Sequence, residues 1–330
     1  MTSRTHGTTA CSGARVRIVQ DPGPAVVAFR RPEFQPEGDF HVRVLLLCSS
    51  FNGLSQRVWT ELTGAGHEVT VQAMADAGDG LDNDERIRRA VATSDPDIIL
   101  CPFLKERVPD DVWSARRTII IHPGPKGDRG PSSLDWAITE AAPQWGVTAL
   151  QAVAEMDAGP IWASRTFPMP TESPRKSALY NGPVADAAVE LVREVMTKAA
   201  DSSFVPEPLD YDRPDVFGRL RPTMRQADRR FDWSDSTAEI LRRIRAADGS
   251  PGVRTTLAGL EVSVFDAHPG TASPGEPGTI ALRRHGAVLV RTGDGAIWIG
   301  HARVVNGEPG KRIKLPATMV LGDRIADVPE

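Results

Sequence analysis

The stretch Ile119–Ile138, IIIHPGPKGDRGPSSLDWAI, says more about the fold of this protein than any other part of its sequence. A run of isoleucines ends at His122, and a loop rich in glycine, proline and serine follows before the apolar rhythm returns. A short, nearly pure β-branched run is typical of a strand that is buried on both faces, as in the middle of a parallel sheet. His122 therefore either simply ends a strand or is presented at a strand end for chemistry.

Similar apolar runs precede this stretch at regular intervals, and helical patterns separate them. The runs begin at Val42, Val69 and Ile98, and the helical segments span about 54–62 and 82–92. Alternating strands and helices predict an open, doubly wound, mostly parallel α/β sheet of the Rossmann-like kind. Ligands of such sheets bind beyond the carboxyl ends of the strands, and His122 stands at one such end.

The pattern continues after the loop and then changes character. A helix capped by Ser132 or Ser133 is expected first, then two strands around a turn at Asp157–Gly159, and then an amphipathic helix over 182–196. Beyond a turn-rich segment come a helix and several short strands, with a hairpin signal at Gly293–Gly295. This part predicts a small β-rich, barrel-like (OB-like) C-terminal domain. The expected boundaries are a loosely ordered extension at 1–41, a catalytic domain at 42–205, a connector at 206–222 and the C-terminal domain at 223–330.

Composition narrows the class of protein. The 330 residues include 39 Lys plus Arg against 43 Asp plus Glu, a net charge of −4, which does not favour nucleic acid or an anionic membrane as a partner. Three widely spaced cysteines form no metal-binding or disulfide pattern. We therefore expect a cytoplasmic protein with small-molecule ligands, no metal, no nucleic-acid partner and no membrane span.

Two residues are the first candidates for chemistry. His122 ends one strand, and Asp157 stands in the turn that ends another. Each has an ordinary alternative, since strand ends commonly carry histidine and an Asp-x-Gly sequence commonly just makes a turn. Together, an imidazole and a carboxylate in one cleft stabilise an oxyanion and accept a proton, the two needs of acyl transfer.

The glycine-rich loop after His122 is a weaker candidate. Lys126 and Arg129 stand between glycines spaced three apart, so backbone amides and two cations could hold a phosphate or a carboxylate. The loop matches neither a Walker loop nor a dinucleotide fingerprint. A rigid turn with solvated charges explains it equally well.

The series H…RG…S.LDWAI…GVT…MDAG resembles the formyltransferase fold family, whose members take a formyl group from 10-formyltetrahydrofolate. The family has a strand ending in Asn-x-His, a loop carrying Arg-Gly and an Asp-x-Gly. His122, Arg129-Gly130 and Asp157 fall on the histidine, the Arg-Gly and the aspartate of that pattern. The asparagine position holds Ile120 instead, so the amide that helps to bind the formyl oxygen in the family is missing here.

Longer strings resemble one subfamily, the HypX (HoxX) hydrogenase maturation proteins, over about residues 42–330. They include LCSSFNGLSQRVW, CPFLKERVP, LQAVAEMDAGPIWASRTFPM, RPTMRQADRRFDW and KLPATMVLGDR. This subfamily joins a formyltransferase part to an enoyl-CoA hydratase-like part. It is associated with formyl transfer to coenzyme A and release of CO for the iron of [NiFe]-hydrogenase. The chain ends about where the hydratase-like part would begin, which favours a fragment or a free-standing formyltransferase, and a hydratase-like partner is one expectation.

The resemblance implies a 10-formyltetrahydrofolate-dependent formyltransferase with coenzyme A as the acceptor. It implies that His122 polarises the formyl carbonyl, and that Asp157 orients His122 and helps to deprotonate the nucleophile. Residues assigned to the ligands are Leu104 near the pterin, Lys126 and Arg129 at anionic groups, and Ser132 or Gln151 as donors in place of the missing asparagine. The alternatives are an N-formyltransferase acting on a small-molecule amine and a non-catalytic module that binds folate or coenzyme A.

Overall fold

The structure is a computed structural model that describes residues 27–28, 41–74, 80–272, 274–306 and 313–330. The chain divides into two compact units, residues 1–119 and 120–330. The loosely ordered extension expected at 1–41 lies outside the described residues, apart from 27–28 and 41. The domain boundaries expected at 205 and 223 stay a prediction.

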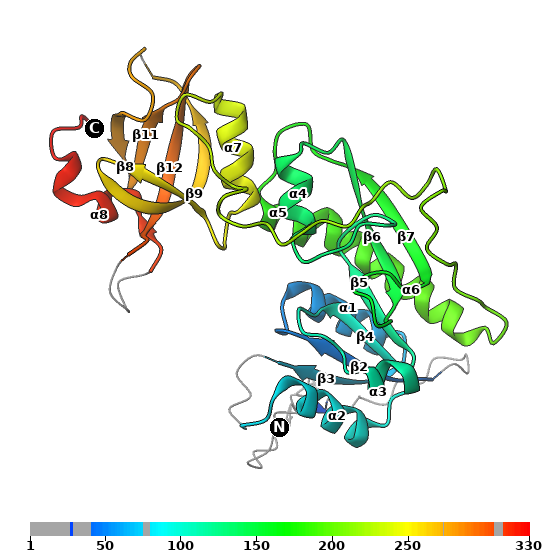
Figure 1. Ribbon diagram of the computed structural model, residues 1–330. Helices are drawn as coiled ribbons and strands as arrows, with labels where there is room; N and C mark the ends of the chain where they lie inside the picture. Colours follow the sequence, from blue (N-terminus) through cyan, green and yellow to red (C-terminus); the bar gives the residue numbers. More distant parts are fainter. Residues whose placement is uncertain (1–26, 29–40, 75–79, 273, 307–312) are drawn as a thin grey trace, which may run out of the picture. The chain divides into compact units, whose positions relative to one another are not determined.

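The first unit holds a sheet whose strands are the apolar runs of the sequence (Figure 1). Its central strand is β2 (Arg43–Cys48), which pairs in parallel with β3 (Glu68–Ala73) on one side and β4 (Ile98–Phe103) on the other. The two-residue β1 (Val27–Ala28) adds to β3 in the antiparallel direction. The last five residues of β2 are buried, as expected for a central strand that is covered on both faces.

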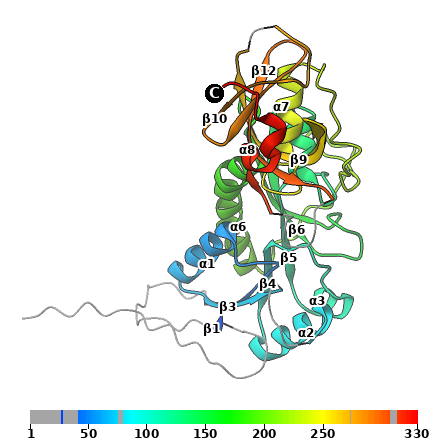
Figure 2. The same ribbon diagram turned by 90° about the vertical axis from the view of Figure 1, so that its left-hand side faces the viewer.

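Helices cover both faces of this sheet. α1 (Gly53–Gly64) packs on β3 and β4, and α2 (Asn83–Ser94) packs on β2 and β3 from the opposite side (Figures 1 and 2). A polar side chain directly before each helix accepts a hydrogen bond from the backbone three residues on, which starts the helix at that point. The short α3 (Asp110–Ala115) was not expected from the sequence. The doubly wound arrangement is therefore confirmed.

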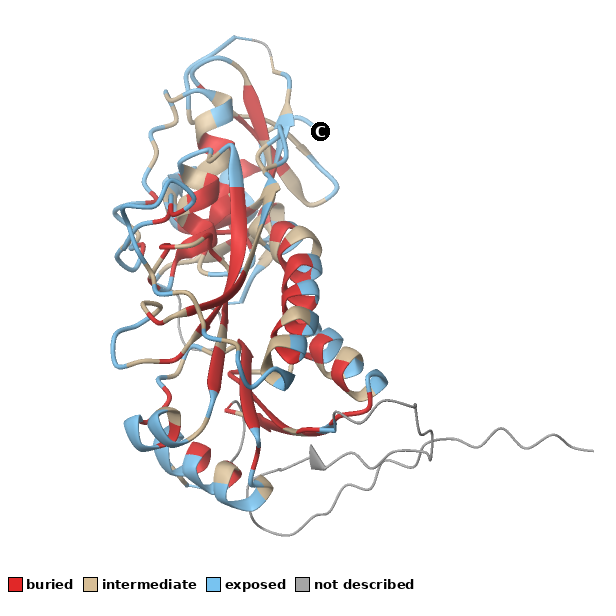
Figure 3. Ribbon diagram, turned by 90° about the vertical axis from the view of Figure 1, so that its right-hand side faces the viewer, coloured by how far each residue is buried: buried red, intermediate tan, exposed pale blue. Residues whose placement is uncertain are grey.

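Strand β5 (Thr118–His122) carries the chain into the second unit. There β6 (Gln144–Gln151) and β7 (Ile161–Pro168) form an antiparallel pair around the expected turn. A single turn, α5 (Lys176–Leu179), and a π-helical turn over Tyr180–Val184 lead into α6 (Ala185–Ala200). α6 packs its apolar stripe against β6 and β7, and Figure 3 shows buried inner faces and exposed outer faces on the helices.

The helix that follows the loop begins as expected, but its cap differs. α4 spans Ser133–Thr139, and no serine side chain caps it. The hydroxyl of Ser132 instead accepts a hydrogen bond from the backbone N–H of Met224 at 3.0 Å. The hydroxyl of Ser133 donates to the carbonyl of Pro123 at 2.6 Å. Both serines therefore tie the start of the helix to other segments, so the expectation of a capping serine was wrong.

A second, antiparallel sheet forms the C-terminal part of the chain, as expected. Its strands are β8 (Val253–Leu257), β9 (Leu260–Gly270), β10 (Ile280–Arg284), β11 (Ala287–Arg291), β12 (Ala296–Val304) and β13 (Leu315–Pro316). They follow the order β10-β11-β12-β9-β8, with β13 beside β12, and β11 and β12 join at the predicted hairpin. Helix α7 (Thr237–Ala246) packs on β9, and α8 (Ala317–Leu321) with the 3-10 turn Gly322–Ile325 closes the core.

The connector, residues 206–222, runs beside the loop that follows β5. Backbone N–H groups of Gly218 and Arg221 donate to the carbonyls of Lys126 and Arg129, both at 3.0 Å. The approach is close because glycines line it: a Cβ on Gly130, whose φ is +113°, would lie 2.2 Å from the carbonyl oxygen of Arg221. The connector is thus laced to the loop that carries the candidate residues.

No helix in the described part of the chain is long and apolar enough to cross a membrane. Within the same residues, no three His, Cys, Asp or Glu side chains gather closely enough to hold a metal ion.

Candidate active site

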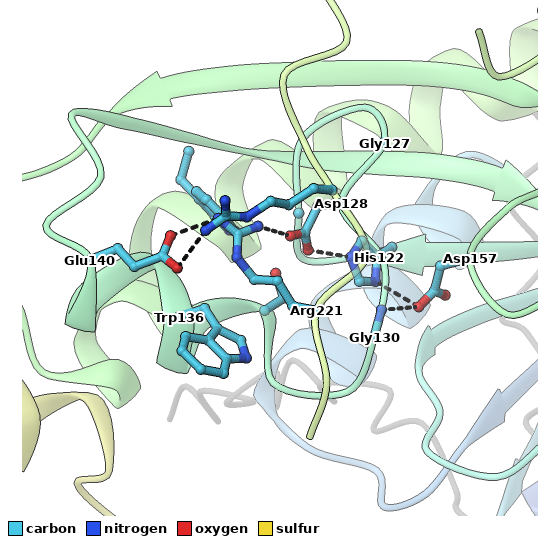
Figure 4. A network of polar contacts seen from close by, with 12 residues as sticks. His122, Gly127, Asp128, Gly130, Trp136, Glu140, Asp157 and Arg221 are labelled. Carbon is cyan, nitrogen blue, oxygen red and sulfur yellow. Dashed lines mark hydrogen bonds and ion pairs between the residues drawn. The ribbon is translucent and has the colours of Figure 1, made fainter. Parts of the chain in front are cut away.

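His122 is the last residue of β5, and its imidazole is buried between two carboxylates (Figure 4). Its Nε2 lies 2.8 Å from Oδ2 of Asp128, and its Nδ1 lies 3.5 Å from Oδ2 of Asp157. The expected meeting of His122 and Asp157 at one end of the sheet is therefore present. The shorter contact, however, belongs to Asp128, a residue that the sequence reasoning did not single out.

Asp128 belongs to a row of alternating charges that leads away from His122. Its side chain is 0% exposed, and its Oδ1 accepts from Nη1 of Arg221 at 2.7 Å. The same guanidinium donates through Nη2 to Glu140 at 2.8 Å and lies over the ring of Trp145, 5.3 Å from its centre. A buried carboxylate requires such a partner, because an unpaired charge in the interior is strongly unfavourable.

Asp157 is held by the turn between β6 and β7 and by the loop after β5. Its φ of +53° lies in the left-handed region, which aspartate tolerates better than most residues. Its Oδ2 accepts from the backbone N–H of Gly130 at 3.1 Å. Next to it, Arg129 donates through Nε to the carbonyl of Met156 at 2.9 Å and through Nη2 to Glu155 at 2.6 Å. The Arg-Gly pair therefore holds the turn and leaves the carboxylate of Asp157 12% exposed.

The surroundings of His122 favour its charged form. Burial alone lowers the pKa of His122 and is the largest single effect, but the hydrogen bond that the ring donates to Asp128 and the negative charges of Asp157 and Asp128 together outweigh it. The pKa of His122 is raised as a result. A buried imidazolium beside a partly exposed carboxylate can donate a hydrogen bond to a developing oxyanion while the carboxylate takes up a proton.

Known proteins resemble this chain in sequence and structure. Residues 223–313 match the family described as formyl transferase, C-terminal domain. The methionyl-tRNA formyltransferase of Acidiphilium cryptum is 30% identical over 248 residues, which cover 71% of this chain and 77% of that protein. The chain belongs to the formyltransferase family.

Longer relatives match the chain more closely. The hydrogenase maturation factor HoxX of Bradyrhizobium diazoefficiens is 43% identical over 289 residues, covering 87% of this chain and 49% of HoxX. The crystal structure of HypX from Aquifex aeolicus in complex with tetrahydrofolic acid is 40% identical with a TM-score of 0.80, covering 88% of this chain and 49% of that one. The formyltransferase chain thus spans about half the length of these two relatives, and the resemblance to the HypX (HoxX) subfamily is confirmed.

The other residues assigned to ligands from the sequence occupy varied places in this formyltransferase. Lys126 forms ion pairs with Glu207 at 3.2 Å and Asp215 at 2.7 Å, and so fastens the loop to the connector. Since Arg129 also has protein partners, neither cation is free in this structure to hold an anionic ligand. Their contact with folate or coenzyme A stays a prediction.

Ser132, Gln151 and Leu104 also stay predictions as ligand-binding residues. The hydroxyl of Ser132 is buried at the backbone of Met224, and Oε1 of Gln151 accepts from the indole of Trp162 at 3.4 Å. Leu104 is half-buried directly after β4 in the first unit. Ile120, at the position of the family asparagine, is half-buried and points to the same side of β5 as His122, because side chains two apart on a strand share a face.

The sequence reasoning missed Asp128 and Arg221. A signal for Asp128 was present, since an acid in a glycine-rich loop six residues after a candidate histidine is a possible partner for it. No comparable signal marked Arg221, which is 93 residues from Asp128 along the chain. Only the lacing of the connector onto the loop brings the two together.

Replacing Gly124 by alanine should disturb the site by steric clash. A Cβ at Gly124 would lie 2.3 Å from Oδ2 of Asp128 and 2.6 Å from Nε2 of His122, so the pair must separate. We expect the free energy of unfolding, measured by chemical denaturation, to fall by about 1–3 kcal/mol. The matched control is Gly64→Ala, because a Cβ on Gly64 meets nothing within 4 Å. Equal stabilities for the two variants would contradict the close contact.

Proposed function

We propose that this formyltransferase moves the formyl group of 10-formyltetrahydrofolate to the thiol of coenzyme A. The observation that carries the proposal is the buried imidazole of His122 between two carboxylates at the end of β5, in a chain 43% identical to HoxX over 289 residues. The complex of HypX with tetrahydrofolic acid supports the choice of donor. The family-level likeness supports the reaction class, and the acceptor follows from the resemblance to the HypX (HoxX) subfamily.

In the proposed reaction the thiol sulfur attacks the formyl carbon, and the bond between that carbon and N10 of the folate breaks. The thiol proton passes to Asp157, whose partly exposed carboxylate accepts it, and then to N10, so that the products are formyl-CoA and tetrahydrofolate. His122 donates a hydrogen bond to the formyl oxygen while this oxygen carries negative charge. Ile120 offers no donor there, so His122 carries a larger share of the stabilisation.

An amine acceptor is the second candidate, and one observation favours it. The methionyl-tRNA formyltransferase of Acidiphilium cryptum, which the chain matches over 77% of its length, is named for formyl transfer to methionyl-tRNA, whose methionyl group carries a primary amine. A primary amine needs the same two groups, an oxyanion donor and a proton acceptor. A small-molecule amine therefore remains the alternative acceptor.

The deciding experiment is incubation of the purified chain with 10-formyltetrahydrofolate and either coenzyme A or a panel of primary amines, with product masses as the readout. We expect formyl-CoA in the presence of the chain and none without it. Formylated amine without formyl-CoA would favour the amine alternative. Binding of the folate without transfer to any acceptor would leave only a binding module.

We further propose that a hydratase-like protein consumes the formyl-CoA, since HoxX is about twice as long as the matched region. The test is addition of such a protein to the formyl-CoA reaction, with CO release as the readout. CO should appear only when both proteins, 10-formyltetrahydrofolate and coenzyme A are present. Release of CO from the two substrates by the hydratase-like protein without this chain would contradict the proposed order of steps.

A further inference from the structure

Asp128 is a second carboxylate at His122, and the proposed reaction gives it no part. It differs from Asp157 in its exposure to solvent and in its distance from the imidazole. Its side chain is 0% exposed against 12% for Asp157, and its contact with the ring is 2.8 Å against 3.5 Å. A group that is closed off from solvent and already bonded to the imidazole is poorly placed to take a proton from an entering nucleophile.

Asp128 is also held from several sides. Its carboxylate accepts from Nη1 of Arg221, and its backbone N–H donates to the carbonyl of Pro125 at 2.9 Å. The loop fits closely here, because a Cβ on Gly218 would lie 2.0 Å from the backbone nitrogen of Asp128. Arg221 is in turn held by Glu140 and by the face of Trp145. The ion pair of Asp128 and Arg221 is thus fixed in place by its neighbours and can support the imidazole of His122.

This support decides which nitrogen of His122 is available for chemistry. Nε2 points at Asp128, so only Nδ1, on the side of Asp157, faces a group that is partly open to solvent (Figure 4). We propose that Asp128, held by Arg221, is a positioning residue that fixes the imidazole of His122 through Nε2 and leaves Nδ1 as the nitrogen that acts on the formyl oxygen. This role rests on the proposed function.

A consequence for the proton on the ring follows. A carboxylate paired with a guanidinium only accepts hydrogen bonds, so Nε2 keeps its proton in both charge states of His122. Nδ1 then carries a proton only when the ring is an imidazolium, and only in that state can it donate to the formyl oxygen. The rate of transfer should therefore fall as the pH rises through the pKa of His122, which the two aspartates raise against the effect of burial.

The charged groups near the imidazole come from four segments of the chain. Asp128 from the loop and Asp157 from the β6–β7 turn face the imidazole directly. Arg221 from the connector and Glu140 after α4 stand behind Asp128, while Arg129 stands behind the turn of Asp157. Asp128→Asn removes the nearest negative charge and its hydrogen bond to the ring, so the pKa of His122 should fall.

The test is nuclear magnetic resonance of the full chain labelled with ¹⁵N in its histidines, with His122→Gln used to assign the signals of His122. We expect the neutral ring to carry its proton on Nε2 in the unaltered chain. In Asp128→Asn the titration midpoint should move to lower pH and the form protonated on Nδ1 should appear. Asp157→Asn should also lower the midpoint but keep the proton on Nε2. Asp111→Asn, at an exposed carboxylate of the first unit, should change neither.

Transfer assays separate positioning from a merely structural role. In Asp128→Asn the alkaline limb of the pH–rate profile should move to lower pH by the same amount as the titration midpoint of His122. In Asp128→Glu both should return part of the way to their positions in the unaltered chain. If Asp128→Asn unfolds because Arg221 is left with an unmatched charge, the double variant Asp128→Asn/Arg221→Met removes both charges together and should show the same changes in His122. An unaltered tautomer and midpoint in the folded variants would overturn the proposal, even if the chain proved to transfer no formyl group. An altered ring with an unshifted pH–rate profile would overturn its part in the reaction.

Discussion

Formyl transfer by the His122→Ala variant should be slower by about 10²–10³-fold or more, because loss of one oxyanion donor typically costs that much. The effect should lie at or beyond this range here. Ile120 stands where the family has an asparagine, so the structure offers no amide at that position to share the charge. The measurement is the single-turnover rate at saturating 10-formyltetrahydrofolate.

The control for this variant is His285→Asn. His285 is exposed in the turn between β10 and β11, and its φ of +48° suits asparagine. Folate binding should survive in both variants, since His122 is assigned to the formyl oxygen and not to the pterin. A near-normal rate in a folded His122→Ala variant would mean that the histidine at the end of the isoleucine run only terminates a strand.

Asp157→Asn should lower the rate by about 10²–10⁴-fold, the range associated with loss of general acid–base catalysis. The change is nearly isosteric, and the amide oxygen can still accept from the N–H of Gly130, so the turn should keep its shape. Asparagine also tolerates the left-handed backbone at this position. What is lost is the group that takes the proton of the nucleophile, together with one of the two negative charges that face His122.

Combining the two changes tests whether the residues act as a unit. The double variant His122→Ala/Asp157→Asn should be little slower than the slower of the two single variants, because groups that act in one step are strongly non-additive. Rate losses that multiply instead would assign His122 and Asp157 to separate steps. Single-turnover rates of all four proteins decide between these outcomes, with thermal unfolding measured in parallel to exclude loss of fold.

Local patterns predicted most of the fold. Short apolar runs identified β2, β3, β4 and β5, and apolar spacing identified α1, α2 and α6, because these elements are selected by side chains that are near one another along the chain. The hairpin of β11 and β12 followed from glycines that suit a tight turn. The short α3 carries only six residues, too few for a periodic pattern to emerge.

Part of the candidate active site could also be predicted from the sequence. His122 ends β5 and Asp157 lies in the turn that follows β6, and strand ends on one side of a sheet gather side chains from distant segments. The sequence therefore sufficed to bring these two together. It also suggested that Lys126 binds an anionic ligand, whereas in the structure this lysine pairs with Glu207 and Asp215 of the connector. The positive charge of a lysine favours an anionic partner, but the sequence does not reveal whether that partner is a ligand or a carboxylate of the protein.

By itself, then, the amino-acid sequence determined most of the strands and helices and the pairing of a histidine with a turn aspartate at a strand end, since each depends on local spacing or on the common direction of parallel strands. Only the tertiary structure decided that Asp128 is the closer partner of His122 and that Arg221 balances its charge. Glycines at 130 and 218 allow the connector to lie against the loop at distances that a side chain would forbid. This close approach decides which residue pairs with the buried carboxylate of Asp128. Burying a charge is unfavourable unless an opposite charge lies beside it, and the packing determines which opposite charge that is.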